Sequence, residues 1–286
     1  MKDDIIAWWS GGITSAVACY LAIKDFGIDR VRIVMIDTFN EDEDTYRFKK
    51  DCESLYGKDI EVISEIGSKY ESITHVWYKN KSLNVANGAI CSSELKRVAR
   101  KRFQKNNYFT HQVFGFDTSE PNRAKSMTLN YPETKAIYPL LKENLSKEDC
   151  VKIFTELKVD IPRMYKLGFK NNNCFQTGCV QGGIGYWQKI MVEFPDKFDM
   201  MSNVEHELTK LKGKPVTMLK DQSNDAKKSG VKNVFLKHNP DYPHIKDISM
   251  MRGFKVEPLN ECNGFCGVND LDKRVSTEKE INYEEN

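Results

Sequence analysis

The first 120 or so residues of this 286-residue chain alternate between short apolar runs and amphipathic patterns with helical spacing. Short β-branched apolar runs are typical of buried strands, and apolar residues three and four positions apart are typical of helices. Such an alternation predicts an α/β fold, with a parallel twisted sheet covered by helices on both faces. The expected strands span residues 5–9, 31–36, 60–63 and 112–116, and the expected helices span 14–26, 44–56 and 92–103.

After about residue 145 the pattern changes. Ser146 with Asp149 three positions later predicts a helix N-terminus, and helical patterns also cover 180–194 and 198–211. Residues 213–270 are rich in loop-forming residues, and the last fifteen residues are charged and nearly free of apolar side chains. We therefore expect an α/β domain over 1–145, a helical and loop-rich, cysteine-containing part over 146–271, and a disordered tail over 272–286.

The segment Ser10-Gly11-Gly12-Ile13-Thr14-Ser15 joins the first expected strand to the first expected helix. Glycines permit a tight turn and let a ligand approach the backbone, and a helix N-terminus presents N–H groups with partial positive charge. Ser10, Thr14 and Ser15 add hydroxyl donors. The loop thus predicts a phosphate or pyrophosphate site in residues 1–145. The alternative is a plain turn before a helix, and the spacing matches neither the Walker A loop nor the dinucleotide fingerprint.

This loop resembles the pyrophosphate-binding loop of the adenine nucleotide alpha-hydrolase, or PP-loop ATP pyrophosphatase, superfamily. Further segments resemble the phosphoadenosine phosphosulfate (PAPS) reductase-like family of that superfamily, in the correct order over about residues 5–270. These segments are Asp37-Thr38 with Thr45 and Phe48, Cys91 to Lys96, Gly115-Phe116 with Glu120 and Arg123, Tyr138-Pro139-Leu140, and the stretch from Pro162 to Trp187.

The resemblance implies cleavage or transfer on the α-phosphate side of ATP or PAPS. The loop would hold phosphates, and Gly115 and Glu120 would belong to the nucleotide site. Asp37 would hold Mg²⁺ through water or meet the ribose. Lys96 and Arg123 would neutralise charge that develops during the reaction. The alternatives are a solvated basic helix face for Lys96 and a surface ion pair between Arg123 and Glu120.

Two departures from the family pattern bear on the chemistry. Position 14 is Thr where the superfamily usually has Asp, and Thr is a much weaker ligand for Mg²⁺. PAPS reductases end in Glu-Cys-Gly-Leu-His, whose cysteine attacks the sulfate sulfur. This chain instead reads Glu261-Cys262-Asn263-Gly264-Phe265-Cys266, which keeps the cysteine and loses the residues after it.

Four of the eight cysteines form two closely spaced pairs, Cys174 with Cys179 and Cys262 with Cys266. Together they could form a tetrathiolate site for zinc or a [4Fe–4S] cluster. Other interpretations remain open: four reduced cysteines packed in small loops, a redox pair, or Cys262 as a nucleophile. Cys19, Cys52 and Cys150 fall on helical patterns and are expected to be small buried side chains.

The leading hypothesis is an enzyme that binds ATP or PAPS and acts at the α-phosphate side, a step that sulfur transfer to an acceptor could follow. One alternative is a thiol-dependent PAPS reductase that releases sulfite and needs a thioredoxin-type reductant. The other is a non-catalytic nucleotide-binding module. The acceptor is a small molecule or a nucleic acid. The basic residues over 96–102 favour a nucleic acid, whereas the net charge of +2 gives no global argument for one.

The composition bears on where in the cell we expect the protein. No run of apolar residues approaches the roughly 18–20 that a membrane helix needs. The acidic start of the chain does not resemble a signal peptide, and eight cysteines are too sparse for a disulfide scaffold. We expect a cytoplasmic homo-oligomer with no membrane partner.

Overall fold

A five-stranded parallel sheet forms the centre of the N-terminal half. The computed structural model describes residues 3–85, 88–172 and 174–257. The sheet has the order β3-β2-β1-β6-β7, and Ile5 of β1 pairs with Val31 of β2 on one side and His111 of β6 on the other. Its strands are β1 (Ile5–Trp8), β2 (Val31–Ile36), β3 (Ile60–Ile63), β6 (His111–Val113) and β7 (Ala136–Ile137).

The strand order places a topological switch point between β1 and β6. From β1 the chain adds β2 and β3 on one side, and then returns to add β6 and β7 on the other side. At such a point the loops after the two neighbouring strands leave in opposite directions and open a crevice at their carboxyl ends. The loop of residues 10–15 follows β1, and Gly115 follows β6, so both lie at this crevice.

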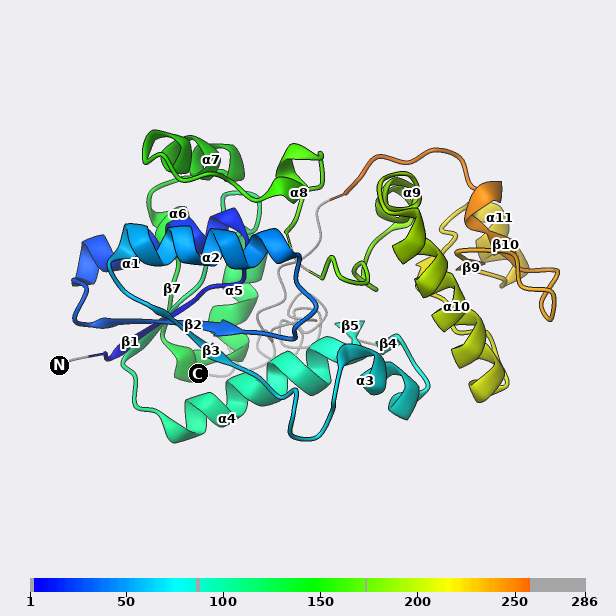
Figure 1. The fold of residues 1–286 in the computed structure, drawn as a ribbon, viewed down its shortest axis with the longest axis horizontal. Coiled ribbons are helices and arrows are strands. Elements are labelled where there is room, and N and C mark those ends of the chain that lie inside the picture. The colour runs from blue at the N-terminus through cyan, green and yellow to red at the C-terminus, as the bar shows by residue number, and fades with distance from the viewer. Residues whose placement is uncertain (1–2, 86–87, 173, 258–286) are drawn as a thin grey trace, which may run out of the picture.

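Helices cover both faces of the sheet, as Figure 1 shows, and this confirms the predicted fold class. Side chains alternate along β1, so Ile5, Ala7 and Trp9 face one core while Ile6 and Trp8 face the other. Both tryptophans are therefore core residues. The first core is completed by α1 (Ile13–Phe26), α2 (Glu43–Tyr56), α6 (Pro139–Lys142) and α7 (Lys147–Glu156), and the second by α4 (Val98–Asn106) and α5 (Pro121–Asn130).

The predicted element boundaries agree closely with the structure in most places. The strands over 31–36 and 60–63 match, and α7 begins at the expected capping box of Ser146 and Asp149. Three elements differ from the expectation. The helix expected over 180–194 is α9 (Ile184–Glu193) and begins four residues later than predicted. The strand expected over 112–116 is β6 and ends at Val113, and the helix expected from Ser92 begins as a π-helix over Ser92–Arg97 before α4.

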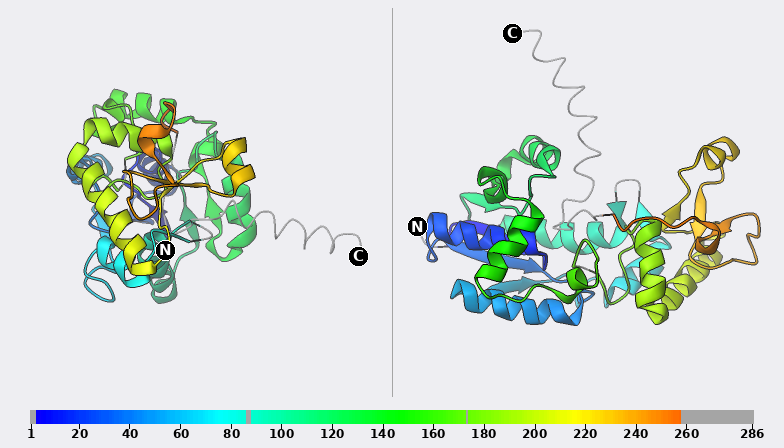
Figure 2. Two further views of the ribbon diagram at one scale, coloured as in Figure 1. Left: turned by 90° about the vertical axis from the view of Figure 1, so that its right-hand side faces the viewer. Right: turned by 90° about the horizontal axis from the view of Figure 1, so that it is seen from above.

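A third core lies beside the sheet domain and contains Trp77, Trp187 and Met201. This part and the sheet domain lie side by side in Figure 1 and in the right-hand view of Figure 2. Among the described residues, no helix combines the length and apolar character needed to cross a membrane. The elements of this part are α3 (Ile73–Asn80), β4 (Asn84–Val85), β5 (Gly88–Ala89), α8 (Arg163–Lys166), α9 (Ile184–Glu193), α10 (Pro195–Lys212), β8 (Leu219–Lys220), α11 (Asn224–Ser229), β9 (Asn233–Phe235) and β10 (Lys246–Asp247).

Glu205 of α10 is a fully buried carboxyl group that joins the helix to the three-stranded sheet of β10, β9 and β8. Its two oxygens accept hydrogen bonds from the backbone N–H groups of Met218 and Leu236, each at 2.7 Å. Burial disfavours the charged form and raises the pKa of Glu205 to about 8, although both hydrogen bonds act in the opposite direction.

The raised pKa of Glu205 predicts a loss of stability at alkaline pH. The folded protein keeps this proton up to a pKa of about 8, whereas the unfolded chain releases it near 4.5. The free energy of unfolding therefore falls as pH rises between these values, by up to about 5 kcal/mol from this group. Urea titrations from pH 5 to pH 9 should show a shallower decline for Glu205→Gln than for the wild type. Equal declines would contradict the assignment.

Candidate active site

The loop of residues 10–15 is a compact, buried turn held by Ser15. The Ser15 hydroxyl donates to the Gly12 carbonyl at 2.8 Å and accepts from the Ser10 N–H and the Ser10 hydroxyl at 3.0 and 2.9 Å. The Ser15 side chain therefore shapes the loop from within. Gly12 caps α1 without a side-chain acceptor, and the first turn of the helix carries no acidic residue. This N-terminus keeps the positive end of its dipole available to an anion.

Two glycines allow neighbouring segments to approach this loop. A Cβ atom on Gly115 would lie 2.6 Å from both the Cα and N atoms of Ser15, so the chain after β6 packs directly against the first turn of α1. Gly11 has a φ of +88°, and a Cβ there would lie 2.8 Å from the Thr45 methyl group. Gly115 therefore packs against Ser15 and Gly11 packs against Thr45, and no larger side chain fits at Gly115 without moving backbone.

Asn172 fixes the loop from the other half of the chain. Its Nδ2 donates to the Gly11 carbonyl at 2.9 Å and to the Thr45 hydroxyl at 3.0 Å, and only 1% of the residue is exposed. The Tyr165 hydroxyl accepts from the Ile13 N–H at 3.2 Å. Asn172 therefore holds the loop across 161 residues of chain.

Removing the Asn172 side chain should weaken the loop and any ligand that it holds. Asn172→Ala loses two buried hydrogen bonds, each worth about 1 kcal/mol. We expect roughly tenfold weaker binding of an adenine nucleotide, measured by calorimetry. Asn203→Ala, at an exposed position on α10, is the matched control. An affinity equal to that of the control would show that the loop does not depend on Asn172.

The end of β2 contributes a second set of polar groups. The Asp37 carboxylate accepts from the Phe39 N–H at 2.7 Å and from the Tyr46 hydroxyl at 3.0 and 3.2 Å. Tyr46 therefore holds Asp37 at the carboxyl edge of the sheet, where the sequence placed it. The next residue, Thr38, has a buried hydroxyl with no hydrogen-bond partner among the described residues and lines a small pocket.

Lys96 lies in that pocket and is buried, not on a solvated face as in the alternative interpretation. Its Nζ lies 3.4 Å from Oε1 of Glu41, and the other Glu41 oxygen accepts the Cys174 N–H at 2.9 Å. Burial raises the pKa of Glu41, and the Lys96 ammonium opposes that rise. Glu41 thus joins the segment after β2, the π-helix and the loop before α9. Because Lys96 is buried, water does not screen the charge of its ammonium group.

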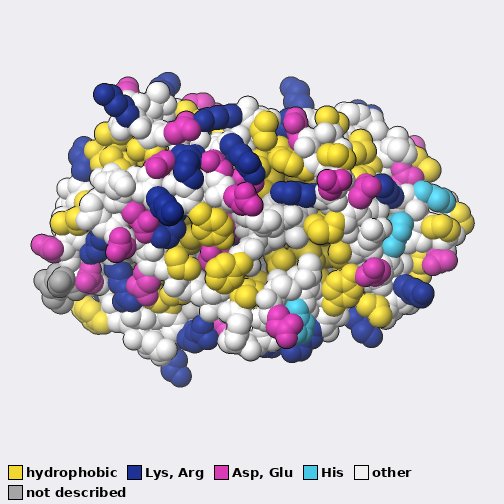
Figure 3. Space-filling model, in the orientation of Figure 1, with side chains coloured by type: hydrophobic (Ala, Val, Ile, Leu, Met, Phe, Trp, Pro, Cys, Tyr) yellow, Lys and Arg dark blue, Asp and Glu magenta, His cyan; other side chains and the backbone are white. Residues whose placement is uncertain are grey.

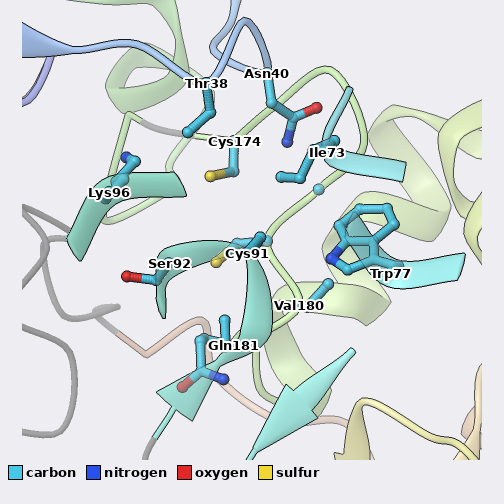
Figure 4. A pocket seen from close by; sticks show the side chains of 13 residues that line it. Thr38, Asn40, Ile73, Trp77, Cys91, Ser92, Lys96, Cys174, Val180 and Gln181 are labelled. Atoms are coloured by element: carbon cyan, nitrogen blue, oxygen red, sulfur yellow. The ribbon is translucent and has the colours of Figure 1, made fainter. Parts of the chain in front are cut away.

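Figure 4 shows the pocket, with Cys91 and Cys174 on opposite walls and Lys96 at one side. Its cavity measures about 20 Å³, roughly the room that one water molecule needs. Cys174 and Cys179 both line it, so the structure brings together the first predicted pair. Among residues 3–85, 88–172 and 174–257, no three metal-ligating side chains form a cluster. Cys262 and Cys266 lie outside the described residues, as does the predicted tail, so the tetrathiolate site stays a prediction.

Arg123 and Glu120 lie at the start of α5, beyond β6. They form an ion pair, and the guanidinium group of Arg123 lies 4.5 Å from the centroid of the Phe116 ring. Phe116 in turn stacks on Tyr138. Arg123 is only 6% exposed, so this pair belongs to a packed region and not to the open surface that the alternative interpretation assumed.

Glu41 is a site residue that the sequence did not identify. It stands in the acidic run of residues 41–44, which reads as the start of a helix. Its position after β2 could have identified Glu41 as a site residue, because ligands bind at the carboxyl edge of a parallel sheet.

Together, the strand order and the loop after β1 define an α/β protein with a glycine-rich loop at the switch point of its sheet. Comparison with models of known families identifies the family of the chain. Residues 4–180 match the model of the phosphoadenosine phosphosulfate reductase domain, and the chain belongs to this family. The resemblance based on the sequence motifs is thereby confirmed. No curated protein matches the chain.

Two solved structures are similar to the chain. One is phosphoadenylyl-sulfate (PAPS) reductase from Candida auris in a phosphate complex, with 18% identity over 59% of this chain and 80% of that chain and a TM-score of 0.46. The other is the NH3-dependent NAD synthetase from Campylobacter jejuni in complex with nitrate. It has 16% identity over 73% of this chain and 84% of that chain, and a TM-score of 0.39.

Proposed function

We propose that this protein is an enzyme that binds ATP or PAPS and catalyses cleavage or transfer at the α-phosphate side of the nucleotide. The observation that carries the proposal is the loop of residues 10–15 at the switch point, with the N-terminus of α1 behind it and Gly115 packed against it. These features provide backbone N–H groups and a helix dipole for phosphate oxygens.

In this proposal Lys96 and Arg123 are the cations that stabilise developing negative charge. Lys96 suits the role because it is buried, and an ammonium group in a dry pocket acts on a nearby anion more strongly than one in water. Asp37 would orient the ribose or hold Mg²⁺ through water. Its carboxylate is already positioned by Tyr46 and the Phe39 N–H, which leaves a pre-organised acceptor.

A thiol-dependent PAPS reductase is the second candidate, and the family match favours it. In that reaction Cys262 would attack the sulfate sulfur, and a thioredoxin-type reductant would release sulfite. Zinc or a [4Fe–4S] cluster held by Cys174, Cys179, Cys262 and Cys266 would serve sulfur transfer instead.

The acceptor in the first proposal is a small molecule or a nucleic acid. On the face shown in Figure 3, Lys and Arg side chains lie among Asp and Glu side chains and do not form one continuous basic patch. That face gives a nucleic acid no extended electrostatic footprint. Both acceptors therefore stay in the proposal, and we propose that the enzyme is homo-oligomeric.

Product analysis tests the proposal and separates the candidates. The purified protein is incubated anaerobically with ATP or with PAPS and a thiol donor, and products are resolved by chromatography. AMP and pyrophosphate would support nucleotide activation, and sulfite with adenosine bisphosphate would support the reductase. Ser10→Ala should abolish either reaction. Nucleotide binding with no turnover, even after candidate acceptors are added, would favour a non-catalytic module.

A further inference from the structure

The segment between Cys174 and Cys179 is a turn whose two ends are left-handed. Cys174 has a φ of +61°, which is unusual for a residue with a side chain, and Gly178 has a φ of +85°. A Cβ on Gly178 would lie 2.6 Å from the Trp187 ring, so the turn is packed closely against α9. This backbone folds the chain back on itself and brings the two cysteines to the same cavity.

Hydrogen bonds from two segments, residues 40–41 after β2 and α9, hold the turn. Glu41 accepts the Cys174 N–H at 2.9 Å, and the Cys179 N–H donates to the Tyr186 hydroxyl at 3.0 Å. Between them, the Asn40 side chain donates to Thr177 at 2.9 Å and the Asn40 carbonyl accepts the Gln176 N–H at 3.1 Å. Strain at Cys174 is thus maintained by surrounding structure, a pattern found at functional sites.

The two thiols differ in their access to solvent. A hydrogen bond joins their side chains. Cys174 is enclosed, whereas Cys179 is partly exposed. An exposed thiol beside a buried one is the arrangement in which the first can attack a disulfide and the second can complete the exchange.

We propose that Cys174 and Cys179 form a dithiol–disulfide pair that reacts with small disulfides at the partly exposed Cys179. The Cys179 thiolate attacks one sulfur of the disulfide, which leaves a mixed disulfide and releases one thiol. Cys174 then attacks the Cys179 sulfur, and the second thiol departs with the proton that Cys174 gives up. Two protein thiols are oxidised to one disulfide, and one small disulfide is reduced to two thiols.

The exchange does not depend on the proposed nucleotide reaction. It is also incompatible with the tetrathiolate hypothesis, because thiolates bound to a metal cannot close a disulfide without losing the metal. The turn already holds both cysteines at one cavity, so the exchange needs side-chain rotation and not a rearranged fold.

Peptide mapping of the full-length protein tests the proposal. Reduced protein is treated anaerobically with mixtures of oxidised and reduced glutathione, quenched in acid and alkylated. Tryptic cleavage after Lys170 and Lys189 gives one peptide of residues 171–189, which contains Cys174 and Cys179 and no other cysteine. We expect this peptide to lose both alkylation sites and two hydrogens together.

Three cysteine variants and a metal analysis distinguish the dithiol–disulfide pair from the other possibilities. Cys174→Ser should trap Cys179 as a glutathione mixed disulfide, Cys179→Ser should leave Cys174 reduced, and Cys91→Ser should close the pair as the wild type does. Circular dichroism checks the fold of each variant. Two separate glutathione adducts, a disulfide from either residue to another cysteine, or stoichiometric zinc or iron retained by this pair would overturn the proposal.

Discussion

Gly115→Ala should abolish nucleotide binding, because the added methyl group has no space that side-chain movement can create. It would lie 2.6 Å from the backbone of Ser15, in the first turn of α1. Either the chain after β6 or the loop must move. We expect a loss of about 3 kcal/mol in the free energy of unfolding and at least a hundredfold weaker nucleotide binding. Calorimetric titration with ATP and with PAPS and urea unfolding measure the two effects.

The matched control is Gly253→Ala, since a Cβ at Gly253 would meet no atom within 4 Å. It should bind nucleotide as the wild type does. If Gly115→Ala keeps the wild-type affinity, the phosphates do not bind at this loop. If it loses stability alone, the packing argument holds and the ligand site lies elsewhere.

Lys96→Met should eliminate turnover and destabilise the fold. Methionine keeps most of the side-chain volume but leaves Glu41 buried without its cation. Breaking a buried ion pair costs about 3 kcal/mol. Losing a cation that stabilises the transition state costs about 10²–10³-fold in rate. Lys101→Met, an exposed position on the same helical segment, should change neither quantity.

The double variant Lys96→Met with Glu41→Gln separates stability from chemistry. It removes both charges, and the amide oxygen introduced at position 41 can still accept the Cys174 N–H. Most of the lost stability should return while the rate stays low. Recovery of turnover in the double variant would show that Lys96 acts only as the partner of Glu41 and does not stabilise the reaction.

Local patterns predicted the sheet well because each strand carries its own signal. Val31–Ile36 is an unbroken apolar run apart from Arg32, and its boundaries could be predicted from the sequence. The loop of residues 10–15 was also predictable, because glycines between a strand and a helix have a local physical meaning.

The environment of Lys96 could not be predicted in the same way. The sequence shows a run of basic residues, which is typical of a solvated face. The π-helix over Ser92–Arg97 widens the turn, and Lys96 becomes buried while Lys101 and Arg102 stay exposed. Asn172 was missed for a related reason. Its bond to Gly11 joins residues that are far apart in the sequence, and only the packing of the two halves reveals it.

A structure of the protein with a non-hydrolysable ATP analogue tests the central claim most directly. We expect phosphate oxygens within hydrogen-bond distance of backbone N–H groups of residues 10–15, at the N-terminus of α1. Phosphates bound at another place, with this loop unchanged and unliganded, would contradict that claim.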